Sequence, residues 1–322
     1  MGTPDFAKIS LEALYNAGHN IELVVTNPDR PKGRGMKLVP SPVKEYAISK
    51  NLEIIQPEKI KNNNAVIEKI KNLKPDVICV VAYGKILPKE LLELAKFGAI
   101  NVHGSLLPKY RGAAPIQWAI INSDKKTGIT IMYMDEGLDT GDIISMQETE
   151  ILPNETLGEL WERLAVMGAN LLVNTLELMN KEGVNRVKQG TEATYAPMLT
   201  KDMAKIDWEN KTAKEIKDLV RGLNPILGAY TFLNGKKIKL WKVDMVNVTD
   251  FITQFPEFKE YEYRFKNIQP GTVLYVNDKK GLYVKAKDEI LSIIELQAEN
   301  AKKMSINDFL RGNRIQAVDI FE

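Results

Sequence analysis

The first half of the chain alternates between short apolar runs and segments with apolar residues at helical spacing. The runs are almost continuously apolar, as in strands that are buried on both faces of a sheet. We predict strands at 21–26, 77–82, 98–103, 129–134 and 143–146, and helices at 9–17, 42–50, 65–72, 88–95 and 156–180. This alternation predicts an α/β domain built on an open, mostly parallel Rossmann-like sheet.

The second half is rich in shorter β-like runs. The periodic pattern is lost after residue 189, so we predict a first domain at 1–189, a linker at 190–207 and a second domain at 208–322. Asn234-Gly235 between two apolar runs is a strong hairpin signal. We predict one helix at 212–221 and strands at 228–233, 237–243, 271–276, 281–286 and 290–295. Five short strands of this kind predict a small OB-like β-barrel.

The chain opens on Gly2-Thr3-Pro4-Asp5, a strand-to-helix turn with no strand before it. The strand that feeds the first helix of such a sheet usually lies near its centre. Its loss would leave backbone groups unpaired, at roughly 1–3 kcal/mol for each group. We therefore expect the first strand to be missing here and the natural start to lie about eight residues upstream.

Composition and charge narrow the class of protein. Hydrophobic residues make up 44% and charged residues 27%, as in soluble globular proteins, and the formal charge is only +2. Nucleic acid would therefore bind at a local basic patch. The single cysteine, Cys79, excludes an internal disulfide and a cysteine-built metal site, and it lies in an apolar run as a buried residue would. We expect a cytoplasmic protein with no membrane span and no metal.

Asn101 and His103 end one of the predicted strands. Alternate side chains of a strand share a face, so the amide and the imidazole should lie side by side. Ligands of open α/β sheets bind at the carboxyl ends of the strands. An amide that can hold an oxyanion beside a group that can move a proton suits acyl transfer.

A third polar group comes from the acidic turn at 135–142. A carboxylate from this turn could orient His103 and stabilise its charge. Spacing alone does not choose among Asp135, Asp139 and Asp142.

Three further segments have a composition that suits the binding of ligands. The loop at 105–115 is held by proline and glycine and could offer rigid backbone groups to a flat heterocycle. The basic segment at 29–37, which we interpret as a mobile loop, could clamp a phosphate backbone. The lysine-rich strand at 236–242 could be a nucleic-acid face, although a solvated edge strand has the same composition.

Together these segments resemble the methionyl-tRNA formyltransferase family of folate-dependent formyltransferases. The resemblance covers nearly the whole chain. It rests on the opening turn at 2–7, the basic segments at 27–35 and 40–44, the block NVHGSLLP at 101–108 with its continuation at 110–117, and the aspartate loop at 135–141. The 101–117 block is shared across the wider superfamily, whereas the basic segment and the second domain favour the tRNA enzyme.

The resemblance implies 10-formyltetrahydrofolate as the formyl donor and initiator methionyl-tRNA as the acceptor, with no metal and a monomeric enzyme. It implies Asn101, His103 and Asp139 as the catalytic residues. The folate would bind at Ser105, Leu106, Leu107 and Pro108 and at Val81, Ala82, Tyr83 and Gly84. The tRNA would be bound by Arg30, Lys32, Arg34 and Lys37 of the first domain and by Lys237 and Lys239 of the second.

Two alternatives follow from the same residues. The chain could be another folate-dependent formyltransferase that acts on a small amine, such as an amino-sugar nucleotide or glycinamide ribonucleotide, or a formyltetrahydrofolate hydrolase. A small acceptor would leave the basic segment and the lysine-rich strand without a role. The second alternative is an RNA-binding protein without catalysis, which the presence of Asn101, His103 and Asp139 argues against.

Overall fold

The computed structural model describes the chain except for residues 33–36, 182–183 and 261–263. Contacts divide the chain into two compact units. The first contains Met1–Ile116, Lys126–Glu150 and Leu160–Pro197, and the second contains Gln117–Lys125, Ile151–Glu159 and Met198–Glu322. The domain and linker boundaries predicted above stay a prediction.

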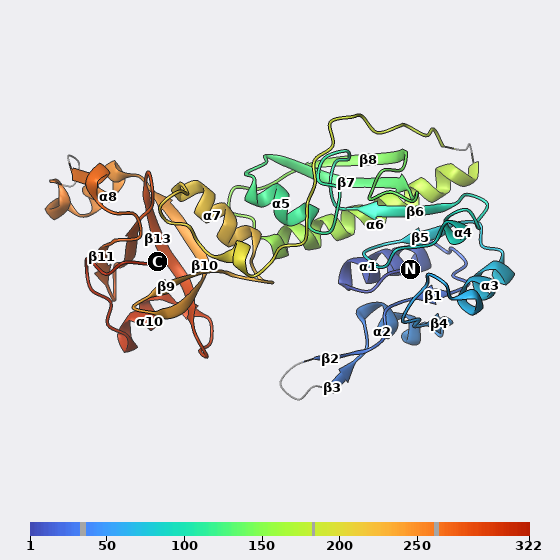
Figure 1. Cartoon of the computed structure of the whole chain (residues 1–322), viewed down its shortest axis with the longest axis horizontal. Helices are drawn as coiled ribbons and strands as arrows, with labels where there is room; N and C mark the ends of the chain where they lie inside the picture. The colour runs from blue at the N-terminus through green and yellow to red at the C-terminus, as the bar shows by residue number, and fades with distance from the viewer. Residues whose placement is uncertain (33–36, 182–183, 261–263) are drawn as a thin grey trace. The chain divides into compact units, whose positions relative to one another are not determined.

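The first unit is an α/β domain, which confirms the predicted class. Its main sheet has the order β5 (Ile78–Val80), β6 (Ala99–His103), β7 (Lys126–Tyr133) and β8 (Ile143–Glu150) (Figure 1). The strands β5 and β6 are parallel, as are β1 (Val24–Val25) and β4 (Ile54–Ile55) of a separate pair. By contrast, β7 is antiparallel to both β6 and β8. The turn between β7 and β8 is too short for the crossover that parallel strands need.

The predicted helices form with shifted ends, and one further helix appears. Ser41 and Asn63 cap α2 and α3, because each side chain accepts a hydrogen bond from the backbone three residues on. The helix α5 occupies a segment that the sequence pattern did not mark. The helices of the first half are α1 (Asp5–Asn16), α2 (Pro42–Ser49), α3 (Asn64–Leu73), α4 (Lys89–Leu92), α5 (Pro115–Ile121) and α6 (Leu157–Lys181).

The first two residues lie between β1 and β5. The Gly2 amide donates to the carbonyl of Val25 at 3.0 Å, and the Val81 amide donates to the carbonyl of Met1 at 2.9 Å. The expectation of a further strand upstream stays a prediction.

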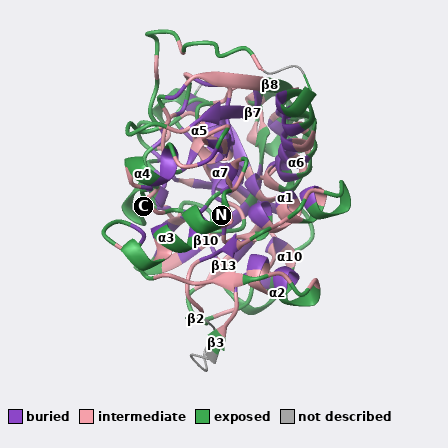
Figure 2. Ribbon diagram, turned by 90° about the vertical axis from the view of Figure 1, so that its right-hand side faces the viewer, coloured by how far each residue is buried: buried purple, intermediate pink, exposed green. Residues whose placement is uncertain are grey.

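The core of the first domain is centred on its sheet. Every residue of β7 after Lys126 is buried, and Figure 2 shows this strand among the buried elements. His103 at the end of β6 is one of the few titratable side chains in this interior, with 5% exposure. Burying such a group requires polar partners, and these define the candidate site.

The second unit is built on antiparallel strands in the order β11-β12-β13-β10-β9. Asn234 and Gly235 join β9 to β10 with φ values of 51° and 71°, so the predicted hairpin is confirmed. Residues 319–322 form backbone hydrogen bonds with both edge strands of this sheet. Glu322 bonds to Phe232 at one edge, and Asp319 bonds to Val273 at the other. The strands are β9 (Ala229–Leu233), β10 (Lys236–Val246), β11 (Val273–Asn277), β12 (Gly281–Lys285), β13 (Ile290–Ala298) and β14 (Met304–Ser305), which pairs with β13.

Helices cover parts of this second sheet. The capping box of Thr212 and Glu215 begins the predicted helix α7. The helices are α7 (Ala213–Gly222), α8 (Val248–Gln254) and α10 (Ile306–Gly312), and the short 3₁₀ turns are Asp202–Ala204, Pro256–Phe258 and Phe265–Asn267. Across the described ranges, no helix is both long and apolar enough to span a membrane.

Candidate active site

The strand β6 places Asn101 and His103 on one face, as the alternation of a strand requires. Asn101 pairs with Val80 of β5 and Met132 of β7, and His103 pairs with Thr130 of β7. Asn101 is half-buried, and His103 is buried. The pair therefore lies on a strand that has a neighbour on each side, which fixes the backbone beneath both side chains.

The imidazole of His103 has an oxygen atom near each ring nitrogen. Its Nε2 donates to the backbone carbonyl of Tyr110 at 3.0 Å, since a carbonyl oxygen only accepts. Its Nδ1 lies 3.6 Å from Oδ2 of Asp139. Burial lowers the pKa of His103, while the charge of Asp139 and the Tyr110 carbonyl act to raise it. The pKa of the ring is therefore lowered overall. When the ring binds a second proton, the Tyr110 carbonyl and the Asp139 carboxylate stabilise its charged form.

The structure selects one aspartate from the acidic turn. The carboxylate of Asp135 holds the turn itself, because it accepts from the Gly137 amide at 3.0 Å and from the Thr140 hydroxyl at 2.6 Å. The carboxylate of Asp139 accepts from the Gly112 amide at 2.8 Å, and its side chain is only 15% exposed. Of the three candidates, Asp139 is thus the one that faces His103.

The loop after β6 passes close to the segment that follows α6. Gly112 has a φ of +123°, and a Cβ there would come within 2.8 Å of the Ala196 carbonyl oxygen. Only glycine tolerates both conditions. This close approach brings the Gly112 amide to Asp139.

The predicted folate residues 105–108 form a tight turn of this loop. The peptide between Leu107 and Pro108 is cis. The Ser105 hydroxyl donates to the Lys109 carbonyl at 2.6 Å, and Ser105 is completely buried. Leu107 is also buried, whereas Leu106 and Pro108 are half-buried. Of these four side chains, those of Leu106 and Pro108 are the ones that solvent reaches.

The second predicted folate segment follows β5. Val81 and Tyr83 are buried, whereas Ala82 and Gly84 are exposed. The Tyr83 ring lies in the core with 2% exposure, and burial raises its pKa to about 12. Its carbonyl accepts from the Asn27 side chain at 3.0 Å. A ligand at this segment would therefore meet backbone and the exposed residues, and would not meet the phenol of Tyr83.

The basic segment of the first domain forms a hairpin, where we had predicted a loop. The strands β2 (Arg30–Lys32) and β3 (Lys37–Val39) pair antiparallel, and Lys32 lies opposite Lys37. Short antiparallel pairing satisfies backbone groups that a loop would leave to water. Arg30 is exposed, and Arg34 lies outside the described residues.

The lysine-rich strand β10 carries cations beside aromatic rings. Lys237 and Lys239 are two residues apart and therefore share one face of the strand. Nζ of Lys237 lies 3.5 Å from the centroid of the Tyr230 ring. Nζ of Lys239 donates to the Leu227 carbonyl at 2.8 Å. We name the set Lys205, Tyr230, Phe232, Lys237 and Lys239 the basic aromatic face; Nζ of Lys205 lies 5.6 Å from the Phe232 ring centroid.

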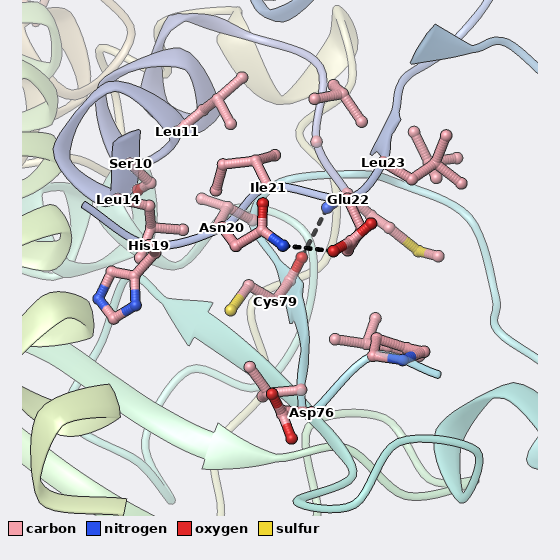
Figure 3. A pocket seen from close by; sticks show the side chains of 18 of the residues that line it. Ser10, Leu11, Leu14, His19, Asn20, Ile21, Glu22, Leu23, Asp76 and Cys79 are labelled. Atoms are coloured by element: carbon pink, nitrogen blue, oxygen red, sulfur yellow. Dashed lines mark hydrogen bonds between the residues drawn. The ribbon is translucent and has the colours of Figure 1, made fainter. Parts of the chain in front are cut away.

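A cavity of about 330 Å³ lies elsewhere in the first domain, between β1 and β5 (Figure 3). Leu14, Leu23 and Cys79 are among its wall residues, and His19 lies at its edge. Burial raises the pKa of the Cys79 thiol to about 11. None of the predicted catalytic residues lines this cavity.

The sequence patterns missed two residues that hold the loops around His103. The Gln189 side chain bonds to this loop and to Arg111, and the Thr194 hydroxyl accepts from the Tyr110 amide at 2.9 Å. Both residues lie outside the segments with apolar periodicity, so local spacing held no signal for them.

Comparison with known proteins supplies the family context. The model described as "Formyl transferase" matches residues 1–176, and the model described as "Formyl transferase, C-terminal domain" matches residues 198–314. The methionyl-tRNA formyltransferase of Caldanaerobacter subterraneus subsp. tengcongensis is 46% identical over 317 residues, which cover 98% of this chain and 96% of that protein. The methionyl-tRNA formyltransferase of Alkaliphilus oremlandii is 47% identical over 321 residues, which cover 99% of this chain and 97% of that protein.

A solved structure shares the fold. The N-formyltransferase from Helicobacter canadensis, in complex with folinic acid and dTDP-3-aminofucose, superposes with a TM-score of 0.63 at 20% identity. The match covers 91% of this chain and 97% of that chain. At this identity the likeness concerns the fold alone.

Proposed function

The chain belongs to the formyl transferase family, and we propose that it transfers the formyl group of 10-formyltetrahydrofolate to the α-amino group of methionine on initiator methionyl-tRNA. The observation that carries this proposal is that Asn101 and His103 share one face at the end of β6, while Oδ2 of Asp139 lies 3.6 Å from Nδ1 of His103. The curated relatives named above, with nearly full coverage, support the choice of acceptor.

The reaction needs two things from the protein, which are stabilisation of an oxyanion and transfer of a proton. The neutral amine attacks the formyl carbon, and the carbonyl oxygen becomes an oxyanion. His103 accepts the proton that the amine loses, and the Asn101 amide and the ring charged in this way stabilise the oxyanion. The bond between the formyl carbon and the folate nitrogen then breaks, and His103 carries the proton lost by the amine to that departing nitrogen.

Asp139 acts on His103 and does not touch the reacting atoms in this scheme. A carboxylate at 3.6 Å favours the charged ring through its opposite charge. The Tyr110 carbonyl acts in the same direction from the other nitrogen. Because the side chains of His103 and Asp139 are only 5% and 15% exposed, both contacts are stronger than they would be in solvent.

The folate acts as a substrate that donates its formyl group. We place it along 105–108 and 81–84, where the half-buried Leu106 and Pro108 offer an apolar surface and the exposed Ala82 and Gly84 leave backbone accessible. The Helicobacter canadensis enzyme, which shares the fold, was solved with folinic acid. We expect no metal to take part.

The tRNA is assigned to two basic elements. One is the β2–β3 hairpin with Arg30, Lys32 and Lys37, to which we add Arg34, a residue of the same segment that lies outside the described residues. The other is the basic aromatic face, which includes Lys237 and Lys239. Cations beside aromatic rings suit phosphates and unstacked bases. A monomeric state and a cytoplasmic location stay predictions.

The direct test offers three acceptors to the full-length protein with 10-formyltetrahydrofolate. These are initiator methionyl-tRNA, the same tRNA without methionine, and dTDP-3-aminofucose. We expect formyl-methionine to form on the charged tRNA and no transfer to either control. Transfer to the amino sugar, or release of free formate with every acceptor, would instead support a small-molecule formyltransferase or a hydrolase.

A further inference from the structure

The segment after α6 runs beside both active-site loops. Val187 exchanges backbone hydrogen bonds with Ile143 at the start of β8, at 2.8 and 3.0 Å. The Arg111 amide donates to the Thr194 carbonyl at 2.8 Å, and the Ala196 amide donates to the Arg111 carbonyl at the same distance. This segment therefore contacts the loop after β6 and the turn between β7 and β8, which carry the partners of His103.

Gln189 is the side chain of this segment that reaches the aspartate loop. Its Nε2 donates to the carbonyls of Asp139 and Gly141, at 2.8 Å each. Its Oε1 accepts from Nε of Arg111 at 3.1 Å and from Nη2 at 2.6 Å. The orientation of the amide is unambiguous, because two acceptors face its nitrogen and a guanidinium faces its oxygen.

These bonds lie where the backbone needs support. Asp139 has a φ of +53°, a left-handed conformation that few residues other than glycine adopt. Such a conformation persists only where the surroundings hold it. The two carbonyls bound by Gln189 flank Thr140, so the glutamine clamps the backbone on which Asp139 is mounted.

We propose that Gln189 is a positioning residue that sets the direction of the Asp139 carboxylate toward His103. Its amide ties the carbonyls of the aspartate loop to Arg111 in the loop after β6, which also supplies the Gly112 amide to the carboxylate. Gln189 thus joins the two loops whose relative position determines the gap between Asp139 and His103. The proposal rests on the proposed formyl transfer, for which this pair is needed.

The test compares two substitutions of Gln189 with a matched control. Gln189→Glu keeps the acceptor for Arg111 and removes both donors. Gln189→Asn keeps the amide but is one methylene too short to reach both sides. Asn185→Asp makes the same change from amide to acid at an exposed position four residues earlier. Steady-state formylation, thermal unfolding and the ¹⁵N NMR titration of His103 are measured for each.

We expect kcat to fall about 10- to 100-fold in both Gln189 variants, since a shift of about 1 Å in a catalytic group has effects of this size. KM for folate and for tRNA should stay within about twofold of the wild type, because Gln189 touches neither in this scheme. In Gln189→Asn, which adds no charge, the pKa of His103 should fall, because the Asp139 carboxylate that raises it has moved away. Asn185→Asp should behave as wild type.

Three results would overturn the proposal. They are a wild-type kcat in Gln189→Glu, a loss of kcat/KM that comes from a rise in either KM, and an unchanged titration of His103 in Gln189→Asn. The NMR titration needs no turnover. It therefore still tests the role of Gln189 if the wild-type protein forms no formyl-methionine, a result that would count against the proposed function alone.

Discussion

Oδ2 of Asp139 lies 3.6 Å from Nδ1 of His103, beyond hydrogen-bonding distance but close enough for strong electrostatic interaction. The carboxylate is held at this position by the Gly112 amide at 2.8 Å. Hydrogen bonds of catalytic groups are often long before the substrate binds and shorten in the complex. The resting pair is therefore already arranged to stabilise a proton on the imidazole.

Replacing Asp139 by asparagine should lower the pKa of His103. Burial already lowers this pKa, and the negative charge of Asp139 opposes that effect. Once the charge is removed, desolvation acts with less opposition. The ¹⁵N NMR titration of His103 in both proteins measures the change, and His19, the only other histidine, provides the reference resonance. An unchanged or raised pKa in Asp139→Asn would show that the carboxylate does not act on the ring.

His103 should also make the fold sensitive to acid. Its pKa in the folded protein lies below the ordinary value of 6.5. As the pH falls below 6.5, the unfolded chain therefore binds a proton that the folded chain does not, and the free energy of unfolding decreases. The slope from this one group is at most about 1.4 kcal/mol per pH unit.

The difference between wild type and His103→Gln isolates this contribution. Urea unfolding at pH 7.5 and at pH 5.5 should show a smaller loss of stability in the variant than in the wild type. Carboxylates other than Asp139 contribute equally to both proteins and cancel in the comparison. Equal losses would mean that His103 binds its proton as readily in the folded protein as in the unfolded chain.

Cys79 should resist alkylation in the native protein. Burial raises the pKa of its thiol to about 11, so little thiolate is present at neutral pH. Iodoacetamide at pH 7.5 should modify the folded protein far more slowly than the same protein in guanidinium chloride, as followed by mass spectrometry. Modification of the native protein at the rate of a free cysteine would contradict the raised pKa of this half-buried thiol.

Lys237→Ala should weaken binding of tRNA and leave the folate unaffected. One phosphate contact contributes about one unit to the slope of log affinity against log salt. We expect KM for tRNA to rise several-fold, the slope to fall by about one, and KM for folate to stay constant. Lys279→Ala, an exposed lysine in the turn between β11 and β12, is the matched control. If only KM for folate changed, the basic aromatic face would not be part of the tRNA site.

Local patterns predicted the parts of the site that are local in the chain. Asn101 and His103 are two residues apart on a strand, so alternation alone placed them on one face. Asn234-Gly235 specified its hairpin because the turn needs two residues with positive φ. Local patterns did not choose among the three aspartates of the acidic turn. That choice depended in part on the hydrogen bonds that Asp135 makes within its own turn.

Other features arise from contacts that are distant in sequence. Gln189 lies 50 positions from Asp139 and 78 from Arg111, so no local spacing indicates it. The direction of β7 and β8 also depended on how the chain returns to the sheet. A signal for α5 was present in Pro115, which suits the first turn of a helix, but the flanking glycine and prolines favoured a loop.

The central claim is that His103 and Asp139 act as one unit in formyl transfer, and a double-mutant cycle tests it most directly. Single-turnover transfer from 10-formyltetrahydrofolate to methionyl-tRNA is measured for wild type, His103→Ala, Asp139→Asn and the double variant. We expect a loss of at least about 100-fold in His103→Ala, and a double variant no slower than that single variant. Losses that multiply in the double variant, or near-native turnover in His103→Ala, would contradict the account.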